Sequence, residues 1–192
     1  MNKGILIVAS GPSGVGKGTV HSKIREKLPT LSYSVSVTTR KPRLGEIEGV
    51  DYFFVNLQKF QEMIENNELL EYAQVFDNFY GTPRAYVEEL LNSGRDVLLE
   101  IDVQGALQIK KLMPDALLIF IAPPSMKELE KRLRGRATDE PDVILRRLMD
   151  AAGELSQQKK YDYVLVNDDV ERCAGQYLEI IAKEKEKRNE HN

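Results

Sequence analysis

The sequence is poor in the residues that carry metal, thiol and disulfide chemistry, with one cysteine and two histidines among 192 residues. The single cysteine, Cys173, leaves no disulfide framework within the chain and is typical of a reducing compartment. His21 and His191 lie far apart in the sequence and have no neighbouring cysteine. The sequence therefore argues against a zinc site and against a Ser-His-Asp catalytic triad.

The sequence also has no long hydrophobic run. Its first apolar segment, residues 4–9, is far too short to cross a bilayer. A glycine-rich stretch follows this segment directly, which is not the pattern of a signal peptide. We therefore expect a cytoplasmic protein without a membrane partner.

Neither sign of charge is in large excess, because the chain has 27 basic and 30 acidic residues and a formal net charge of −3. This balance argues against a general nucleic-acid binder, which usually carries a basic face. Basic residues nevertheless gather at residues 40–43 and 131–136, with Arg146 and Arg147 close behind. Two local basic clusters suit a small anionic ligand held at defined points, although a solvated surface explains any one of these charges alone.

What the sequence does contain is an alternation of buried strands and helices, typical of one α/β domain. The pattern predicts strands over residues 5–9, 97–101, 116–122 and 163–166. It predicts helices over residues 16–28, 105–112, 141–160 and 170–188, and one that opens at the capping box of Ser125 and Glu128. Repeated strand–helix units imply a parallel sheet flanked by helices on both faces.

One stretch, residues 32–80, interrupts this alternation. It is rich in Ser, Thr, Tyr and Phe, and its one clear helix covers residues 57–66. We interpret it as short antiparallel strands inserted into the α/β core beside the ligand edge of the sheet. Residues 138–142, between two predicted helices, are expected to form a mobile turn suited to a lid.

The most specific motif follows the first strand and opens the first helix. It reads Gly11-Pro12-Ser13-Gly14-Val15-Gly16-Lys17, in the strand–loop–helix context that a phosphate-binding loop requires. Glycines let backbone N–H groups converge on phosphate oxygens, and Lys17 can reach the β- and γ-phosphates as a point charge. The sequence therefore predicts a P-loop NTPase-type sheet that binds a nucleoside triphosphate.

The loop departs from the usual pattern at one position. Ser or Thr is expected after the lysine as a Mg²⁺ ligand, but this chain has Gly18, with Thr19 one position later. Thr19 lies about 100° further round the helix, so it does not point in the same direction. We expect Mg²⁺ to ride on the ATP phosphates with no direct protein ligand, and Asp102 to reach it through water at most. The alternative for Asp102 is a cap for the helix that follows it.

Further motifs follow the phosphate loop along the chain. They are Ser34-Val35-Ser36-Val37-Thr38-Thr39-Arg40-Lys41-Pro42-Arg43, Gly45-Glu46, Asp51-Tyr52-Phe53-Phe54, Glu71-Tyr72-Ala73, Phe79-Tyr80-Gly81-Thr82, Asp102-Val103-Gln104-Gly105, Pro123-Pro124-Ser125, Arg132-Leu133-Arg134-Gly135-Arg136 and Val166-Asn167-Asp168-Asp169. With these motifs in this order, the chain closely resembles the guanylate kinases from Gly4 to about Lys185. Several separated motifs in the right order are far more specific than any one of them.

The resemblance implies an enzyme that transfers the γ-phosphoryl group of ATP to GMP, giving ADP and GDP, with dGMP as a further acceptor. It implies that the phosphate of GMP is held by Arg40, Arg43, Tyr52 and Tyr80, and that the guanine is read by Ser36, Glu71, Thr82 and Glu100. On the ATP side it implies Gly11, Pro12, Ser13, Gly14, Val15, Gly16, Lys17, Gly18 and Thr19, with Asn167 near the adenine. It implies Lys17, Arg132, Arg136 and Arg147 as the catalytic residues.

Two positions differ from the family's commonest residues. Thr82 is often Ser in the family and Glu100 is often Asp, and both substitutions keep the functional group. The resemblance also divides the chain into a guanylate kinase-like domain over residues 4–185 and a charged tail over residues 186–192. Within the domain it implies a core of residues 4–31 and 82–185, an inserted monophosphate-binding subdomain at about 32–81 and a lid at about 132–147. The sequence does not indicate an oligomeric state.

The chemistry of the bases supports a guanine acceptor independently. The Watson–Crick edge of guanine offers two adjacent donors, N1–H and the exocyclic NH₂, and a carboxylate such as Glu71 can accept both. The hydroxyls of Ser36 and Thr82 can donate to O6. Adenine presents a lone pair at N1, which the same carboxylate would repel.

Two other functions stay open at this point. One is a kinase for a different nucleoside monophosphate, and the other is a non-catalytic binding module of the same fold. Single residues also have ordinary structural explanations. Tyr52 and Tyr80 could be half-buried strand aromatics, and Glu71 could be a surface charge. Arg132 and Arg136 could pair with Glu128 or Glu140 on a helix face.

Overall fold

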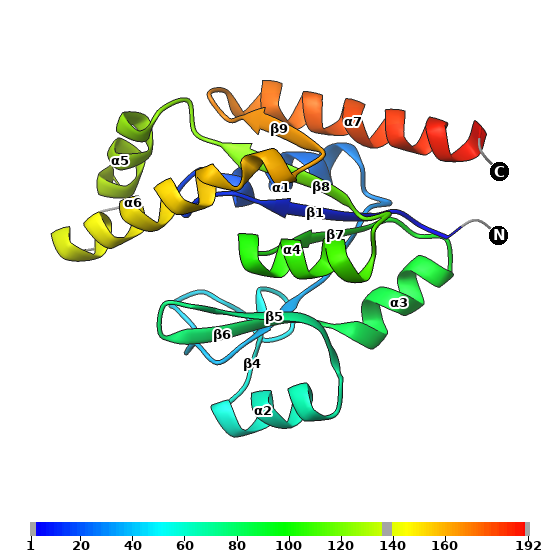
Figure 1. The fold of residues 1–192 in the computed structure, drawn as a ribbon, viewed down its shortest axis with the longest axis horizontal. Coiled ribbons are helices and arrows are strands. Elements are labelled where there is room, and N and C mark those ends of the chain that lie inside the picture. The colour runs from blue at the N-terminus through cyan, green and yellow to red at the C-terminus, as the bar shows by residue number, and fades with distance from the viewer. Residues whose placement is uncertain (1–2, 136–139, 191–192) are drawn as a thin grey trace. The chain divides into compact units, whose positions relative to one another are not determined.

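The computed structural model describes residues 3–135 and 140–190 (Figure 1). They form two compact units. One consists of the chain up to Val8 together with Thr30–Leu117, and the other of Ala9–Pro29 together with the chain from Leu118 onward. Within the described ranges, no helix is long and apolar enough to cross a membrane.

A five-stranded sheet has the strand order β2-β7-β1-β8-β9. Its strands are β1 (Leu6–Ser10), β2 (Ser32–Tyr33), β7 (Val97–Glu100), β8 (Leu117–Ala122) and β9 (Tyr163–Val166). β2 runs parallel to β7, and β9 runs parallel to β8. Every residue of β1 and β8 is buried, as expected for strands of a parallel sheet that is covered on both faces. The predicted parallel sheet is confirmed.

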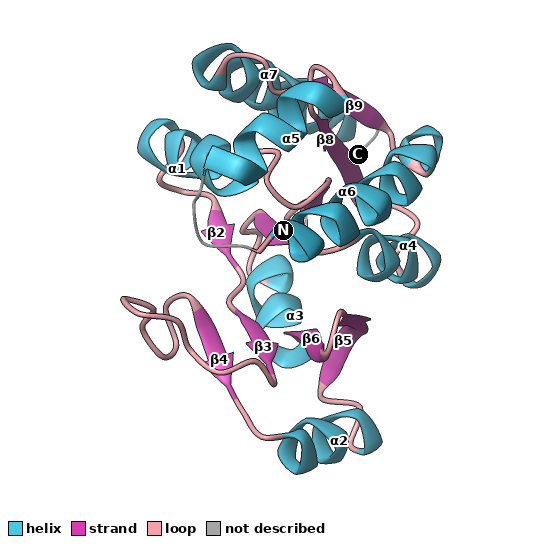
Figure 2. Cartoon of the chain, turned by 90° about the vertical axis from the view of Figure 1, so that its left-hand side faces the viewer, coloured by secondary structure: helices cyan, strands magenta, loops and turns pink. Residues whose placement is uncertain are grey.

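The second unit carries most of the long helices. They are α1 (Lys17–Lys27), α5 (Met126–Gly135), α6 (Pro141–Ser156) and α7 (Val170–Glu190). A short 3₁₀ turn, η1 (Gln158–Lys160), follows α6. α1 packs against α7 (Figure 2), where the buried ring of His21 meets Tyr177 edge-on with 5.8 Å between centroids. At the start of α5, Ser125 Oγ accepts a hydrogen bond from the backbone N–H of Glu128 at 3.1 Å, which confirms the predicted cap.

The first unit contains a separate four-stranded sheet, in the order β4-β3-β6-β5. Its strands are β3 (Ser36–Thr38), β4 (Tyr52–Phe54), β5 (Leu69–Val75) and β6 (Asn78–Pro83). Helix α2 (Leu57–Glu65) covers it through a small core of Val37, Phe60, Met63 and Leu69. Helices α3 (Arg84–Asn92) and α4 (Val103–Leu112) complete the unit.

The interpretation of residues 32–80 needs two corrections. β3 pairs with β4 in parallel, with Ser36 opposite Tyr52, whereas antiparallel strands were expected. The loop over residues 39–51 returns the chain to the start of the sheet, so that β4 runs in the same direction as β3. The second correction concerns β2, which pairs with β7 in the five-stranded sheet and therefore does not begin the inserted strands.

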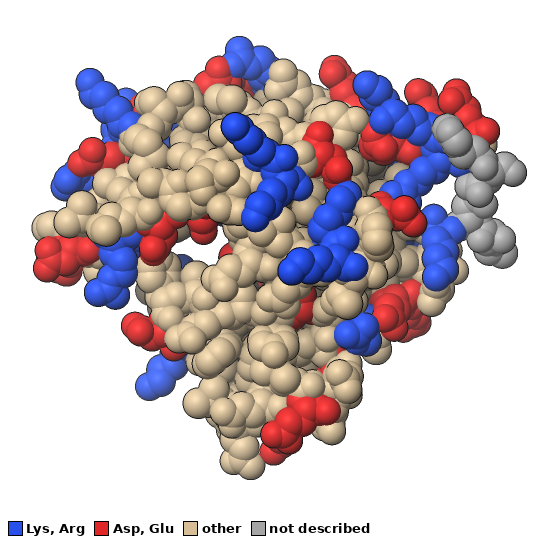
Figure 3. All heavy atoms as spheres, in the orientation of Figure 1, with Lys and Arg blue, Asp and Glu red and all other residues tan. Residues whose placement is uncertain are grey.

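The other predicted helices and strands agree with the structure to within a few residues, and α6 begins at Pro141 as expected. The sequence does not predict α3. Residues 136–139, which belong to the expected lid and include Arg136, lie outside the described residues. On the face drawn in Figure 3, acidic and basic side chains are interspersed, which agrees with the small net charge.

Candidate functional site

The loop between β1 and α1 lies too close to neighbouring atoms to accommodate side chains at Gly11 and Gly16. A Cβ atom built on Gly11 would lie 2.1 Å from the carbonyl oxygen of Ile121 in β8. Gly16 has φ +96°, and its Cβ would lie 2.7 Å from Nδ2 of Asn167. Both residues also have positive φ, a region that glycine occupies without steric cost. Glycine at these two positions thus permits the conformation that the loop adopts.

Lys17 lies across this loop as the first residue of α1. Its Nζ donates to the carbonyl oxygen of Gly11 at 2.5 Å and to that of Pro12 at 3.3 Å. The next residue, Gly18, is exposed, and a Cβ built on it would meet nothing within 4 Å. Thr19 is exposed as well. The helix N-terminus adds partial positive charge at the same place.

Two side chains from distant parts of the second unit meet at one carbonyl of the loop. The oxygen of Val15 accepts a hydrogen bond from Nη1 of Arg132 at 3.1 Å and another from Nδ2 of Asn167 at 2.8 Å. Nε of Arg132 donates to Glu128 at 3.2 Å. The ordinary pairing of Arg132 with Glu128 on a helix face is therefore present, together with a contact to the loop.

A second arginine also reaches the loop. Nη1 of Arg147 in α6 donates to Oγ of Ser13 at 3.4 Å. Asn167 is buried, and its Oδ1 has no hydrogen-bond partner among the described residues. Of the residues expected on the ATP side, Arg132, Arg147 and Asn167 are thus brought to the loop, whereas Arg136 lies outside the described residues.

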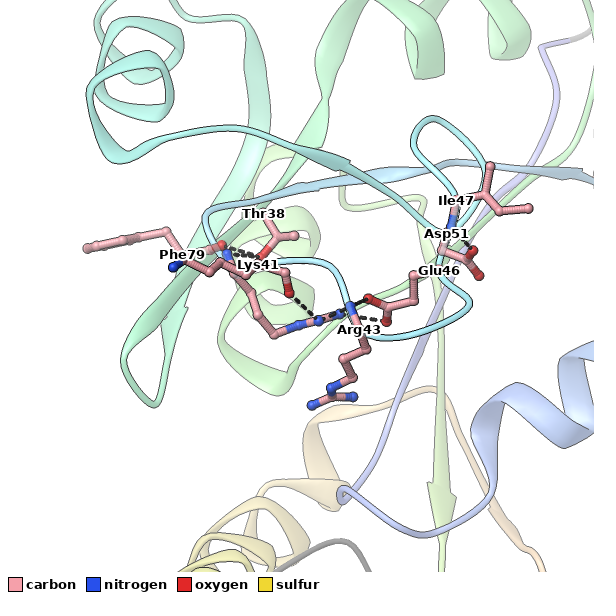
Figure 4. Close-up of polar contacts among 8 residues, drawn as sticks. Thr38, Lys41, Arg43, Glu46, Ile47, Asp51 and Phe79 are labelled. Carbon is pink, nitrogen blue, oxygen red and sulfur yellow. Dashed lines mark hydrogen bonds and ion pairs between the residues drawn. The ribbon is translucent and has the colours of Figure 1, made fainter.

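Arg40, Tyr52 and Tyr80 form a basic and aromatic cluster on the four-stranded sheet in the first unit. Figure 4 shows the polar contacts around Glu46, which lies beside this cluster. Arg40 donates to both carboxylate oxygens of Glu46, at 2.7 and 3.0 Å, and the backbone N–H of Arg43 donates to the same carboxylate at 2.7 Å. The guanidinium of Arg40 lies 5.3 Å from the ring centre of Tyr52. The pKa of Glu46 is lowered, chiefly by its bond to Arg40. The side chain of Arg43 is exposed and extends away from Glu46.

The two tyrosines predicted at this cluster are adjacent. The rings of Tyr52 and Tyr80 meet edge-on with 6.0 Å between centroids, because β4 and β6 flank β3 on either side. Burial raises the pKa of Tyr52 above its ordinary value, so its hydroxyl stays a neutral donor. A hydrogen bond with Tyr80 contributes to the raised pKa of Arg40, after the larger effect of Glu46. Two hydroxyls and a guanidinium therefore converge here.

A buried carboxyl group lies on β5 of the same unit. Glu71 is 3% exposed and stands opposite Thr82 in the β5–β6 register, and Oγ1 of Thr82 donates to Oε1 of Glu71 at 2.6 Å. The pKa of Glu71 is raised to about 7, mainly by burial and also by the charge of Asp102, while the bond from Thr82 opposes the shift. The explanation of Glu71 as a surface charge is wrong. Ser36 is half-buried on β3, where it pairs with Tyr52.

Glu100 and Asp102 follow each other at the carboxyl end of β7. Glu100 is exposed, and its charge contributes to the raised pKa of Tyr52. Asp102 is the N-cap of α4, since its Oδ1 accepts from the backbone N–H of Gln104 at 2.7 Å and of Gly105 at 3.3 Å. The capping alternative for Asp102 is thus confirmed.

The sequence gives no role to the face of α4 that contacts β5. This face carries Gln104, Gly105 and Gln108, and the two glutamines hydrogen-bond to the backbone of β5. Glu46 likewise occurs in a recognised motif without an assigned role. In the sequence, Gly105 stands out only as a glycine early in a predicted helix, where alanine is the better helix former.

Metal ligands are sparse in the structure. In residues 3–135 and 140–190, no group of three or more His, Cys, Asp or Glu side chains is placed to hold a metal ion.

A glycine-rich loop between a buried strand and a helix, in a parallel sheet flanked by helices, defines a P-loop nucleotide-binding domain. The family model for guanylate kinase matches residues 3–184. The chain belongs to the guanylate kinase family.

Individual relatives agree with the family model. The chain is 50% identical over 187 residues to the guanylate kinase of Clostridioides difficile strain 630, covering 97% of this chain and 91% of that protein. It is 52% identical over 182 residues to that of Lactococcus lactis subsp. lactis, covering 95% and 89%. A crystal structure of guanylate kinase from Anaplasma phagocytophilum has a TM-score of 0.81 and 41% identity, covering 95% of this chain and 87% of that one.

Proposed function

We propose that this chain is an enzyme that transfers the γ-phosphoryl group of ATP to GMP, giving ADP and GDP. The observation that carries the proposal is the buried Glu71, an acceptor-only group in the unit that also holds the Arg40–Tyr52–Tyr80 cluster. One subdomain thus offers a site for a base with two adjacent donors and a site for a phosphate. Membership of the guanylate kinase family supports the same reaction.

The cluster on β3, β4 and β6 is assigned to the phosphate of GMP. Arg40 and Arg43 supply planar guanidinium donors, and Tyr52 and Tyr80 supply neutral hydroxyl donors. Glu46 holds Arg40 at 2.7 Å and orients its guanidinium beside Tyr52. A phosphate at this point would find its principal cation already positioned, which lowers the entropic cost of binding.

The guanine is assigned to Ser36, Glu71 and Thr82, with Glu100 nearby at the end of β7. Ionised Glu71 accepts N1–H and the 2-amino group. Because the hydrogen of the Thr82 hydroxyl is directed to Glu71 at 2.6 Å, Thr82 is assigned to orient the carboxylate. Ser36 is then the hydroxyl that donates to O6. dGMP presents the same base and phosphate, so it is expected to be an acceptor as well.

The loop Gly11–Thr19, together with Arg132, Arg136, Arg147 and Asn167, is assigned to ATP. The attacking group is an oxygen of the GMP phosphate, whose second pKa is about 6, so no general base is needed at neutral pH. The protein has to align two anions and balance the charge that moves during transfer. Lys17, the loop amides and the arginines perform this task, and closure of the proposed lid at about residues 132–147 excludes water.

Mg²⁺ is assigned to the phosphates of ATP, where it would neutralise charge on the transferring group. This chain contributes no side chain at Gly18, and Asp102 is committed to capping α4 through Oδ1. Any contact from Asp102 would therefore run through water. The proposal also includes the division of the chain into a core of residues 4–31 and 82–185, an insertion at about 32–81 and a tail at 186–192. It includes a cytoplasmic location as well.

Replacing Gly18 with serine is expected to lower the Mg²⁺ concentration for half-maximal rate by roughly tenfold, because it restores a hydroxyl ligand at the end of the loop. The structure has room for the change, since a Cβ at Gly18 would meet nothing within 4 Å. The measurement is the initial rate against free Mg²⁺, with Gly175→Ser in α7 as the control at another open glycine. An unchanged Mg²⁺ requirement, or full activity of the parent chain in chelator, would contradict the account.

The affinity for GMP is expected to rise as the pH increases through about 7. Burial raises the pKa of Glu71 to about 7, and guanine donors require its ionised form, so protonation below that pH competes with binding. The Thr82→Val variant loses a hydrogen bond that lowers this pKa, so its midpoint should move to higher pH. The phosphate of GMP also titrates, near 6, but its midpoint does not depend on Thr82. Titration calorimetry from pH 5.5 to 8.5 distinguishes the two, and identical midpoints in both proteins would exclude Glu71.

The decisive experiment for the proposed function is a coupled ADP-release assay with GMP, dGMP, AMP, CMP and UMP as acceptors. Preferred turnover of GMP supports the proposal. Better turnover of AMP or a pyrimidine nucleotide would point to a different monophosphate kinase. Binding of GMP without ADP release from any acceptor would indicate a non-catalytic binding module.

A further inference from the structure

Helix α4 is joined to the outer strand of the four-stranded sheet by side-chain amides. β5 is the last strand in the order β4-β3-β6-β5, and α4 lies along it (Figure 1). Nε2 of Gln108 donates to the carbonyl oxygen of Tyr72 at 2.7 Å, and Oε1 of Gln108 accepts from the N–H of Tyr72 at 3.3 Å. Nε2 of Gln104 donates to the carbonyl oxygen of Gln74 at 3.2 Å. The glutamine amides thus occupy the edge of β5 as another strand would.

Between these two glutamines, the helix approaches the carboxyl group of Glu71. A Cβ atom built on Gly105 would lie 2.2 Å from Oε2 of Glu71 and 2.9 Å from its Cδ. Real Cβ atoms do not approach other atoms so closely, so Glu71 would have to move if residue 105 had any side chain. Gly105 therefore permits the observed position of the carboxylate.

Helix formation does not explain a glycine at this position. Gly105 is the third residue of α4, and its φ is not positive, so alanine would adopt the same backbone conformation with a better helix propensity. Ile101 is the other nearby group, with its Cδ1 3.3 Å from the built Cβ, and it could give way by a few tenths of an ångström. The contact that excludes a side chain is the one with Glu71.

The carboxyl group of Glu71 is consequently held from two sides. Thr82 donates to Oε1 at 2.6 Å on one side, and the backbone of α4 at Gly105 lies against Oε2 on the other. The hydrogen bonds of Gln104 and Gln108 keep α4 at that distance from β5. The depth of the carboxylate is thus set by the helix as well as by the strand that carries it.

We propose that Gln104, Gly105 and Gln108 form a positioning face for purine selection, which places Glu71 to accept both N1–H and the 2-amino group of the acceptor base. This inference rests on the proposed function and deepens it. These residues do not touch the substrate, and they act through Glu71. Their effect should therefore appear as lost discrimination between GMP and IMP, which has the N1–H donor but lacks the 2-amino group.

The primary test is Gly105→Ala, with Gly175→Ala in α7 as the matched control, because a Cβ at Gly175 meets nothing within 4 Å. The assay gives kcat and KM for GMP and for IMP. The added methyl group should displace Glu71 and raise KM for GMP by about 10- to 100-fold, since a displacement of about 1 Å can cost this much. KM for IMP should rise less, because IMP has only the N1–H contact to lose. The GMP-to-IMP ratio of kcat/KM should then fall by about tenfold or more. The control should keep the ratio of the parent chain.

Two further variants separate positioning from general damage to the fold. In a Glu71→Asp background the carboxylate is shorter by one methylene, so Gly105→Ala should change the ratio much less there than with Glu71 present. Gln108→Leu keeps an uncharged side chain but removes both hydrogen bonds to Tyr72, and it should lower the ratio with little change in Tm. A purely structural role predicts lower Tm with an unchanged ratio.

The outcomes distinguish this inference from the proposed function. If the parent chain prefers GMP to IMP and both Gly105→Ala and Gln108→Leu keep that preference, the inference is overturned and the function stands. If the parent chain does not phosphorylate GMP, the proposed function fails first. Should Gly105→Ala not fold, Gln108→Leu decides by the same ratio, and an unchanged ratio in this variant overturns the inference.

Discussion

Replacing Lys17 with alanine is expected to lower kcat for GMP phosphorylation by about 10²–10³-fold and to change KM for ATP and GMP much less. The ammonium group lies across the loop even without a ligand, with Nζ 2.5 Å from the carbonyl oxygen of Gly11. Its interaction with phosphate oxygens should strengthen as charge moves during transfer, and such an interaction contributes to kcat. Steady-state kinetics with each substrate varied at saturation of the other measures both constants.

Lys23 provides a matched control for this experiment. It lies on the same helix, but it pairs with Glu26 and Glu171 at exposed positions and not with the loop. Lys23→Ala should leave kcat and KM unchanged, because exposed ion pairs contribute little. An effect of Lys17→Ala confined to KM would show that Lys17 binds ground state and transition state equally, which would contradict its assigned role.

Replacing Glu71 with glutamine should reduce kcat/KM for GMP by about 10³-fold or more, because a site built for two donors would then present a donor of its own. The hydroxyl of Thr82 decides which way the amide turns. If the amide oxygen accepts the Thr82 hydrogen, as Oε1 of Glu71 does at 2.6 Å, the amide NH₂ faces the base. The amide can avoid this clash only by giving up the bond from Thr82.

The measurement is kcat/KM for GMP, with Glu65→Gln as a control at an exposed glutamate of the same unit. The Glu71 variant should also lose the part of the pH dependence of GMP affinity that is centred near 7, because an amide does not titrate in that range. If Glu71→Gln kept both its preference for GMP and its pH dependence, guanine recognition by Glu71 would be wrong.

Much of the fold follows from local sequence patterns. β1 and β8 are continuous apolar runs, and buried parallel strands have this appearance. The direction of β4 could not be predicted, because three-residue strands carry no directional signal and the loop over residues 39–51 decides it. The sequence does not predict helix α3 because it has only nine residues and its N-cap position is Pro83, which offers no side-chain cap.

Some features of the candidate site can likewise be predicted from the sequence, and others cannot. The phosphate loop is contiguous, so its glycines and Lys17 can be read directly from spacing. The approach of Glu71 to Gly105 joins residues 34 positions apart and depends on how a helix meets a strand, which no spacing rule encodes. The contact of Asn167 with Val15 spans 152 positions for the same reason. Sequence patterns identify chemical groups, whereas tertiary distances decide what each group acts on.

The carbonyl oxygen of Val15 accepts two hydrogen bonds, and these fix the orientation of its peptide group. The peptide bond between Val15 and Gly16 is trans, so the carbonyl oxygen and the Gly16 N–H point in opposite directions. Glycine rotates easily, and a flip of this peptide plane would exchange the N–H and the oxygen, which would repel a phosphate at the proposed ATP site. Arg132 and Asn167 hold the oxygen at 3.1 and 2.8 Å and thereby oppose the flip. Their positive ends also polarise the peptide group, which makes the N–H on its other side a stronger donor.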